Sequence, residues 1–158
     1  MAPIKTNVMR LLDGAKIAYE VTTYEVSDGK IDGEAVASKI GKSVEQVFKT
    51  LVAIGKSKVH YVFVIPVSCE LDLKKASIAV GEKSIEMLPV KDLQKVTGYI
   101  RGGCSPIGMK KTLKTCIDER AKSQAQITVS GGKIGVQITL QPQDLANYIG
   151  ASFIQLSK

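Results

Sequence analysis

The residue types best suited to chemistry gather in a glycine-rich loop. Residues 97–111 read TGYIRGGCSPIGMKK and combine adjacent glycines, a Ser-Pro step and three basic side chains. This composition excludes a helix interior or a central strand. The backbone N–H groups of Gly102 and Gly103 are predicted to face an acidic or electron-rich group, such as the oxyanion of an acyl-transfer reaction. A tight turn that requires positive φ is the alternative explanation of the two glycines.

A single lysine, Lys49, is the second candidate catalytic group. It stands within the apolar run VFKTLV (residues 47–52), where strand alternation places it on the same sheet face as Leu51. A lysine among core residues is costly to bury unless it has a partner or a task. The alternative is an edge strand whose lysine points to water.

Protein nucleophiles and metal ligands are scarce. The chain has three cysteines, Cys69, Cys104 and Cys116, and one histidine, His60, with no CxxC pair. No metal site and no cofactor are therefore predicted. A histidine-activated nucleophile would have to use His60, which falls in a predicted strand core. An acyl-transfer reaction would then run without an evident protein nucleophile.

Two further positions border the glycines. Cys104 follows Gly103 in a basic loop, a setting that lowers the pKa of a thiol, and a small apolar filler is the alternative. The second glycine pair, in the segment SGGK at residues 130–133, lacks the lead-in of a phosphate loop. It is predicted to form a hairpin turn, from which Ser130 could face a site.

Composition and charge limit the classes of function. The 158 residues are 44% hydrophobic and 23% charged, which predicts one globular domain over residues 1–158. No apolar run could span a bilayer and no signal region precedes the domain, so a cytoplasmic protein without membrane contact is predicted.

The net charge points to an acidic partner. The formal charge of +7, from 22 basic and 15 acidic residues, makes nucleic acid the first candidate, with a generic basic surface as the alternative. Aromatic content is only 5%, so RNA would be held through its phosphates and shape. The predicted contacts are Arg101, Lys110, Lys111 and Lys133.

Hydrophobic periodicity and turn residues predict the elements that must position these groups. Helices are expected over residues 7–13, 34–40, 73–80, 89–96 and 142–149, with a brief helical turn capped by Ser43 and Gln46. Strands are expected over residues 17–26, 48–54, 59–67, 84–88, 113–118, 126–130, 136–140 and 153–156. Short polar turns at residues 55–58 and 131–133 predict two antiparallel hairpins. This mixture predicts an α+β fold with a mixed sheet.

Four segments, taken in order, resemble one family. They are FKTLV (48–52), LDLKKA (71–76), the glycine-rich loop from Thr97 to Gly108, and VSGGK (129–133) followed by QDL (143–145). They resemble the YbaK family of Cys-tRNA(Pro) deacylases, which is related to the editing domain of bacterial prolyl-tRNA synthetases. The resemblance covers residues 7–153. It implies one α+β domain around a curved, barrel-like mixed sheet flanked by helices.

The resemblance also implies an activity. A family member acts as a trans-editing aminoacyl-tRNA deacylase that removes cysteine mischarged onto tRNA(Pro). The substrate's own thiol attacks its carbonyl and leaves as a thiolactone, while the enzyme contributes positioning and charge stabilisation. Prolyl-tRNA synthetase is an implied partner that selects the tRNA. Two alternatives stay open: an editor of Ala-tRNA(Pro) or another aminoacyl-tRNA that uses water, and a non-catalytic tRNA- or synthetase-binding module.

Site roles follow from the resemblance residue by residue. It implies that Lys49 orients the terminal ribose or the carbonyl, and that Gly102 and Gly103 are the backbone donors to the carbonyl. It also implies that Tyr24, Thr50 and Ser130 border the substrate pocket. Ile31 and Ser105 are predicted to join them as substrate-binding residues, with Ser105-Pro106 as the brace that fixes the direction of the two glycines.

The chain departs from the family pattern at three positions. Cys104 stands where many relatives have an aliphatic residue, Ile31 where relatives carry an aromatic one, and Gln137 where some carry an acidic one. The changes at Ile31 and Gln137 bear on amino-acid selectivity more than on the fold, and the change at Cys104 leaves open a redox-sensitive or nucleophilic thiol.

Overall fold

Helices and strands alternate along the chain, as the periodicity predicts. The computed structural model describes residues 5–158 and contains α1 (Asn7–Gly14), α2 (Gly33–Ile40), α3 (Leu73–Val80), α4 (Val90–Thr97), α5 (Pro142–Ile149) and the 3₁₀ helix η1 (Glu119–Ser123). The strands are β1 (Glu20–Thr23), β2 (Phe48–Gly55), β3 (His60–Pro66), β4 (Ile85–Met87), β5 (Lys114–Asp118), β6 (Ile127–Lys133), β7 (Val136–Leu140) and β8 (Ser152–Ile154). The predicted α+β class is confirmed. Within the described chain, none of the helices is both long and apolar enough to cross a membrane.

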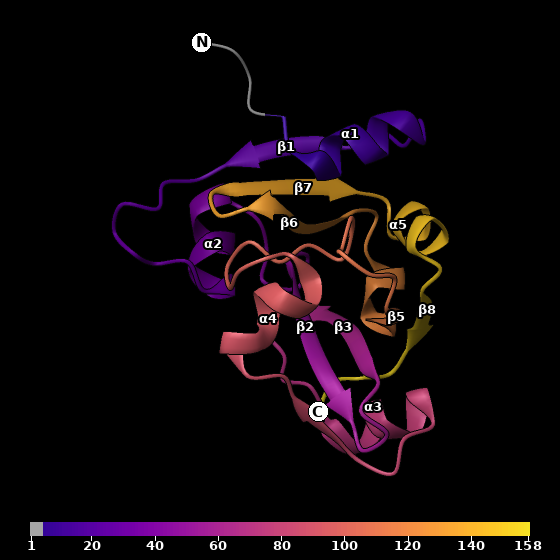
Figure 1. The fold of residues 1–158 in the computed structure, drawn as a ribbon. Helices are drawn as coiled ribbons and strands as arrows, with labels where there is room; N and C mark the ends of the chain where they lie inside the picture. Colours follow the sequence, from indigo (N-terminus) through magenta and orange to yellow (C-terminus); the bar gives the residue numbers. More distant parts are fainter. Residues whose placement is uncertain (1–4) are drawn as a thin grey trace.

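The strands form two sheets, which lie one above the other in Figure 1. The upper sheet has the order β1-β7-β6 and is antiparallel throughout. The lower sheet has the order β4-β2-β3-β5-β8, in which β5 runs parallel to β3 and β8 while the other pairs are antiparallel. A parallel bridge joins Val47, the residue before β2, to Thr128 of β6. The mixed sheet is confirmed, but the strands of residues 5–158 do not close into a barrel.

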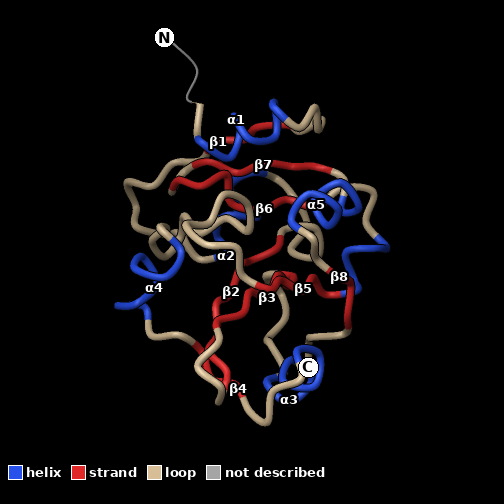
Figure 2. Tube along the Cα trace, turned by 45° about the vertical axis from the view of Figure 1, so that its right-hand side comes forward, coloured by secondary structure: helices blue, strands red, loops and turns tan. Residues whose placement is uncertain are grey.

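The main core fills the space between the two sheets and two helices. Alternate residues of β2 and β3, such as Val52 and Val64, face this core together with Ile138 of β7, Leu12 of α1 and Leu145 of α5. Figure 2 shows α1 and α5 beside the upper sheet and α3 at the opposite end of the molecule. Burial of this apolar surface is the main force that holds the sheets together.

The outer face of the lower sheet has its own core beneath α3. Ala76 of α3 packs there against Ala53, Tyr61 and Phe63 of the β2–β3 hairpin. Because Val52 and Ala53 face opposite cores, the predicted alternation of this hairpin is confirmed. Lys49 therefore lies on the face of Leu51 and Ala53.

Helix α2 is capped at both ends by its own sequence. The Oδ1 of Asp32 accepts a hydrogen bond from the N–H of Ala35 at 3.0 Å, and Gly41 ends α2 with φ of 69°. Asx capping and a left-handed terminal glycine are strong local signals, so this helix is fixed at both ends by its own sequence.

The second predicted hairpin turn is wrong by a few residues. Gly131 and Gly132 lie inside β6, where the pairing register with β7 shifts between Ser130 and Lys133. A Cβ on Gly131 would stand 2.9 Å from a methyl group of Val136. The glycines thus serve a bulge and close packing, and the turn follows at residues 134–135.

Two shorter expectations also change. The segment at Ser43 is a turn instead of a helix, and its Oγ accepts from the N–H of Glu45 at 3.1 Å, so the capping box to Gln46 does not form. The first strand covers only Glu20–Thr23 of the expected residues 17–26, because the partner strand β7 is itself short.

Candidate active site

A pocket of about 350 Å³ opens where β2, the start of α2 and the glycine-rich loop meet β6 and β7. Residues far apart in the sequence line it. Those predicted from the sequence are Tyr24, Ile31, Lys49, Thr50, Arg101, Gly102 and Ser130. Gly103 and Ser105 are absent from its lining. The pocket therefore gathers most of the predicted site, although the sequence spacing alone could not show that these segments converge.

Lys49 lies in the pocket wall on an exposed edge of β2. Its Cα partner on β3 is Ile65, whereas β4 pairs with β2 only from Ala53 to Gly55. The side chain is half-buried and makes no hydrogen bond or ion pair within residues 5–158. Lys49 thus lies at a strand edge, as the alternative interpretation predicted. Its side chain lines a pocket, however, and does not lie on an open surface.

Two buried hydroxyls in the same pocket lack hydrogen-bond partners. They are the phenol of Tyr24 and the Oγ1 of Thr50, and both are covered from solvent. An unpaired buried hydroxyl costs about 1–3 kcal/mol, so such groups are rare unless a ligand completes them. The wall beside Lys49 therefore carries two polar groups whose hydrogen bonding is incomplete in the described chain.

The far wall comes from the β6–β7 hairpin. Ser130 and Gln137 are Cα partners there, and both line the pocket. The Oγ of Ser130 accepts from the N–H of Gly132 at 3.2 Å, which orients it. Gln137 is only 5% exposed, and its amide makes no hydrogen bond to the described residues. Gln137 is thus a pocket residue that the sequence analysis noted only as a departure from the family pattern.

The glycine-rich loop contributes one free donor, where two were predicted. The N–H of Gly103 donates to the carbonyl of Ile100 at 3.0 Å and closes a turn in which Gly102 has φ of 88°. The positive φ explains why residue 102 is a glycine. A Cβ on Gly103 would stand 3.0 Å from the backbone nitrogen of Ile134. Of the pair, only the Gly102 N–H lacks an acceptor within residues 5–158.

Side chains beneath the loop hold its shape. Ser105 is fully buried, and its Oγ accepts from the N–H of Ile107 at 3.3 Å. The hydroxyl of Tyr99 donates to the carbonyl of Ile107 at 2.6 Å, and Thr97 Oγ1 accepts from the N–H of Tyr99 at 3.0 Å. Ser105 is therefore placed to brace the loop, as predicted for the Ser-Pro step, and it does not line the pocket.

Cys104 is a buried thiol with weakened acidity. Its side chain belongs to the main core, and burial raises the pKa of the thiol to about 11, with a hydrogen bond to Thr97 acting weakly in the opposite direction. The basic loop was expected to lower this pKa. Desolvation dominates instead, because the side chain is buried at the edge of the main core where it lines the pocket.

We expect Cys104→Ala to retain most of the acyl-transfer activity that the family resemblance implies. Burial raises the pKa of the Cys104 thiol to about 11, so the neutral form predominates at neutral pH and the thiol is a weak nucleophile there. The small cavity should cost about 1 kcal/mol of stability. Iodoacetamide at pH 8 should alkylate Cys69, which is partly exposed, before Cys104. A hundredfold loss of activity in Cys104→Ala at unchanged Tm would contradict this.

The predicted RNA contacts divide into two groups. Arg101 lines the pocket, and the backbone of Lys133 abuts Gly103 beside it. Lys111 instead lines a second groove of about 340 Å³ with Tyr148. All four basic residues, including Lys110, are exposed. Among residues 5–158, no group of three or more metal-ligating side chains is placed to hold an ion.

Fold and pocket together define an α+β protein whose pocket is lined by Lys49, by polar side chains and by the buried thiol of Cys104. Residues 31–148 match the family described as the aminoacyl-tRNA editing domain. The Enterococcus faecalis protein EbsC, provisionally named a Cys-tRNA(Pro)/Cys-tRNA(Cys) deacylase, is 43% identical over 153 residues, which cover 97% of this chain and 93% of EbsC. The chain therefore belongs to the aminoacyl-tRNA editing domain family, and the recognition of an editing deacylase of the YbaK type is confirmed.

More distant relatives agree with the family. A Brachyspira hyodysenteriae proline–tRNA ligase is 38% identical over 64 residues, which span 40% of this chain and 11% of the ligase. Two crystal structures share the fold. One, of a provisionally named trans-editing enzyme for prolyl-tRNA synthetase, has a TM-score of 0.82 at 23% identity and covers 98% of this chain and 99% of its own. The other, of a hypothetical protein, has a TM-score of 0.87 at 18% identity, with coverage of 96% and 99%.

Proposed function

We propose that the protein is a trans-editing deacylase that removes cysteine mischarged onto tRNA(Pro). The observation that carries the proposal is the meeting of Lys49 with two unpaired buried hydroxyls in one pocket. The naming of EbsC supports the choice of cysteine, and the similarity to part of a proline–tRNA ligase supports the choice of tRNA. The activity would operate in the cytoplasm, with prolyl-tRNA synthetase as a partner.

The substrate would supply the nucleophile. The cysteine sulfur attacks its own ester carbonyl, a C–S bond forms, and the bond from the carbonyl carbon to the ribose oxygen breaks. The thiol proton ends on that ribose oxygen, so the products are a thiolactone and tRNA with a free terminal hydroxyl. His60 begins β3 outside the pocket. Cys104 lines the pocket, but burial raises the pKa of its thiol, so we expect it not to compete with the substrate thiol.

The pocket residues would stabilise charge in this step. The N–H of Gly102 is a free donor for the oxyanion that develops on the carbonyl oxygen. The ammonium of Lys49 would orient the ribose or the carbonyl and offset the negative charge that passes to the ribose oxygen. Tyr24 and Thr50 would satisfy their hydroxyls on polar atoms of the aminoacyl ester. Arg101 and Lys133, at the pocket rim, would meet RNA phosphates.

An editor of alanine that uses water is the second candidate. Ile31 and the buried amide of Gln137 in the pocket wall favour it, because they differ from the aromatic and acidic residues that the resemblance predicts there. Substrate-thiol attack cannot act on alanine, so the two mechanisms separate cleanly.

A panel of tRNA(Pro) charged with cysteine, serine or alanine, each mixed with excess enzyme, tests the proposal. We expect rapid release of cysteine and slow release of the other two. Alanine released as fast as cysteine would replace the substrate-thiol mechanism with the water mechanism. Salt-dependent RNA binding without any deacylation would identify a non-catalytic binding module instead.

Removing the unpaired hydroxyls should separate stability from activity. Tyr24→Phe and Thr50→Val each delete a buried hydroxyl that has no partner, so each should leave Tm unchanged or raise stability by about 1 kcal/mol. Each should also lower kcat/KM for Cys-tRNA(Pro) by about tenfold, which corresponds to one lost hydrogen bond to the ligand. Thermal unfolding and single-turnover kinetics measure the two effects. A fall in Tm with unchanged kinetics would show a structural role.

A further inference from the structure

The segment between β1 and α2 forms one wall of the pocket without regular secondary structure. Tyr24 at its start and Ile31 near its end both line the pocket, while residues 25–30 between them are all exposed. Ile31 also covers the glycine-rich loop, since a Cβ on Gly102 would stand 2.8 Å from its Cδ1. The position of this segment therefore decides the shape of the wall that faces the free donor.

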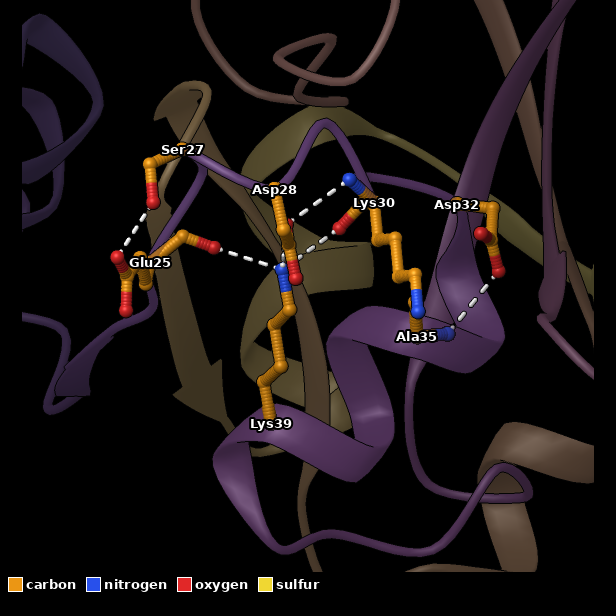
Figure 3. Close-up of polar contacts among 7 residues, drawn as sticks. All are labelled: Glu25, Ser27, Asp28, Lys30, Asp32, Ala35 and Lys39. Atoms are coloured by element: carbon orange, nitrogen blue, oxygen red, sulfur yellow. Dashed lines mark hydrogen bonds and ion pairs between the residues drawn. The ribbon is translucent and has the colours of Figure 1, made fainter.

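One lysine of α2 binds this segment at three points, as Figure 3 shows. The Nζ of Lys39 donates to the carbonyl of Glu25 at 2.7 Å, to Oδ1 of Asp28 at 2.8 Å and to the carbonyl of Lys30 at 2.9 Å. Its side chain is only 21% exposed. Hydrogen bonds from an ionised donor are stronger than neutral ones, and here a single ammonium uses all three of its protons.

The atoms that Lys39 binds are adjacent to the pocket residues. Glu25 directly follows Tyr24, and Lys30 directly precedes Ile31, so the two carbonyls fix the backbone at both ends of the exposed stretch. The ammonium also lies 5.8 Å from the centroid of the Tyr24 ring, within the range of a cation–π contact. Lys39 thus restrains the ring that carries one of the two unpaired hydroxyls.

The helix that carries Lys39 is anchored at the pocket itself. Asp32, the N-cap of α2, lines the pocket, and Lys39 stands in the last turn of the same helix. The segment is therefore held from both ends of one rigid element. The contact with Lys39 lowers the pKa of Asp28, in agreement with an ion pair at the outer side of the segment.

We propose that Lys39 is a positioning residue that holds Tyr24 and Ile31 in the pocket wall and so sets the discrimination between cysteine and other aminoacyl esters. The proposal rests on the proposed function. It assigns Lys39 no contact with the substrate. Its effect passes through the backbone of residues 25–30.

Trypsin cleavage after Lys30 tests the restraint without any tRNA. In Lys39→Ala the Lys30–Ile31 bond should be cut several-fold faster than in the wild-type protein, because the carbonyl of Lys30 is released, and Lys39→Arg should restore part of the protection. Lys42→Ala is the matched control, since Lys42 follows the same helix and its side chain makes no hydrogen bond or ion pair with residues 25–30. Equal cleavage in Lys39→Ala and the wild-type protein overturns the restraint.

Kinetics on the same variants test the link to the site. Lys39→Ala should lower kcat/KM for Cys-tRNA(Pro) by about tenfold and shift Tm little. The ratio of kcat/KM for Cys-tRNA(Pro) to kcat/KM for Ala-tRNA(Pro) should fall as well. The positioning role is overturned if cleavage after Lys30 is faster but kcat/KM and the ratio of the two substrates' kcat/KM values are unchanged. If the wild-type protein deacylates none of the panel, the proposed function fails, and the trypsin result still decides whether Lys39 restrains the segment.

Discussion

Lys49→Ala should reduce single-turnover deacylation of Cys-tRNA(Pro) by about 10²–10³-fold, the usual effect of removing one preorganised charge-stabilising group from an active site. The ammonium is half-buried in the pocket and no ion pair or hydrogen bond from residues 5–158 consumes it. Removing it breaks no side-chain hydrogen bond or ion pair among residues 5–158. The Tm should therefore stay close to that of the wild-type protein.

Two companion variants sharpen this measurement. Lys56→Ala removes an exposed lysine from the turn of the same hairpin and should leave the rate unchanged. Lys49→Arg keeps the charge but replaces a compact ammonium by a planar guanidinium, so it should recover only part of the rate. Turnover retained in Lys49→Ala would remove Lys49 from the mechanism.

Asp118→Ala should be the most destabilising single change away from the pocket. The carboxylate is 1% exposed and joins the end of β5 to the C-terminal segment. Its Oδ2 accepts from the N–H of Leu156 at 3.2 Å and from the N–H and Oγ of Ser157 at 2.9 and 2.5 Å. Its Oδ1 caps η1 by accepting from the N–H of Arg120 at 2.9 Å. Alanine would leave these donors buried and unpaired.

The expected loss is about 3 kcal/mol, or a fall in Tm of roughly 6–12 °C for a domain of this size. Glu119→Ala is the matched control, because Glu119 is the exposed acidic neighbour and should change stability by less than about 0.5 kcal/mol. Urea unfolding of the two variants measures the difference. An Asp118→Ala protein as stable as Glu119→Ala would show that the C-terminal segment contributes little to the fold.

The sequence predicted best what local chemistry decides. The helices at residues 73–80 and 142–149 and the hairpin around residues 55–58 form as expected, because caps, prolines, glycines and alternation act within a few residues. The glycine pair at residues 131–132 was wrongly predicted to form the turn, because its role depends on a contact across the hairpin. Their role depends on Val136 across the hairpin, and a turn and a bulge call for the same residue type.

Most residues predicted for the site line the pocket, but their arrangement in space could not be predicted from the sequence. Tyr24, Thr50 and Ser130 converge only through the pairing of distant strands, so the family resemblance, and not their spacing, pointed to them. The backbone hydrogen bond from the N–H of Gly103 to the carbonyl of Ile100 occupies a donor that the sequence analysis had assigned to the substrate. The direction of the Cys104 side chain decides its pKa, and Lys39 gave no periodic or motif signal at all. Each of these depends on contacts that only the folded chain brings together.

A crystal structure with a non-hydrolysable 3′-cysteinylamido-adenosine tests most directly whether this pocket receives the aminoacyl end of the tRNA. The analogue should occupy the 350 Å³ pocket, with its carbonyl oxygen within hydrogen-bond distance of the Gly102 N–H and its polar atoms meeting Lys49, Tyr24 and Thr50. Binding of the analogue in the groove beside Lys111 and Tyr148, with the pocket left empty, would contradict the assignment of the site.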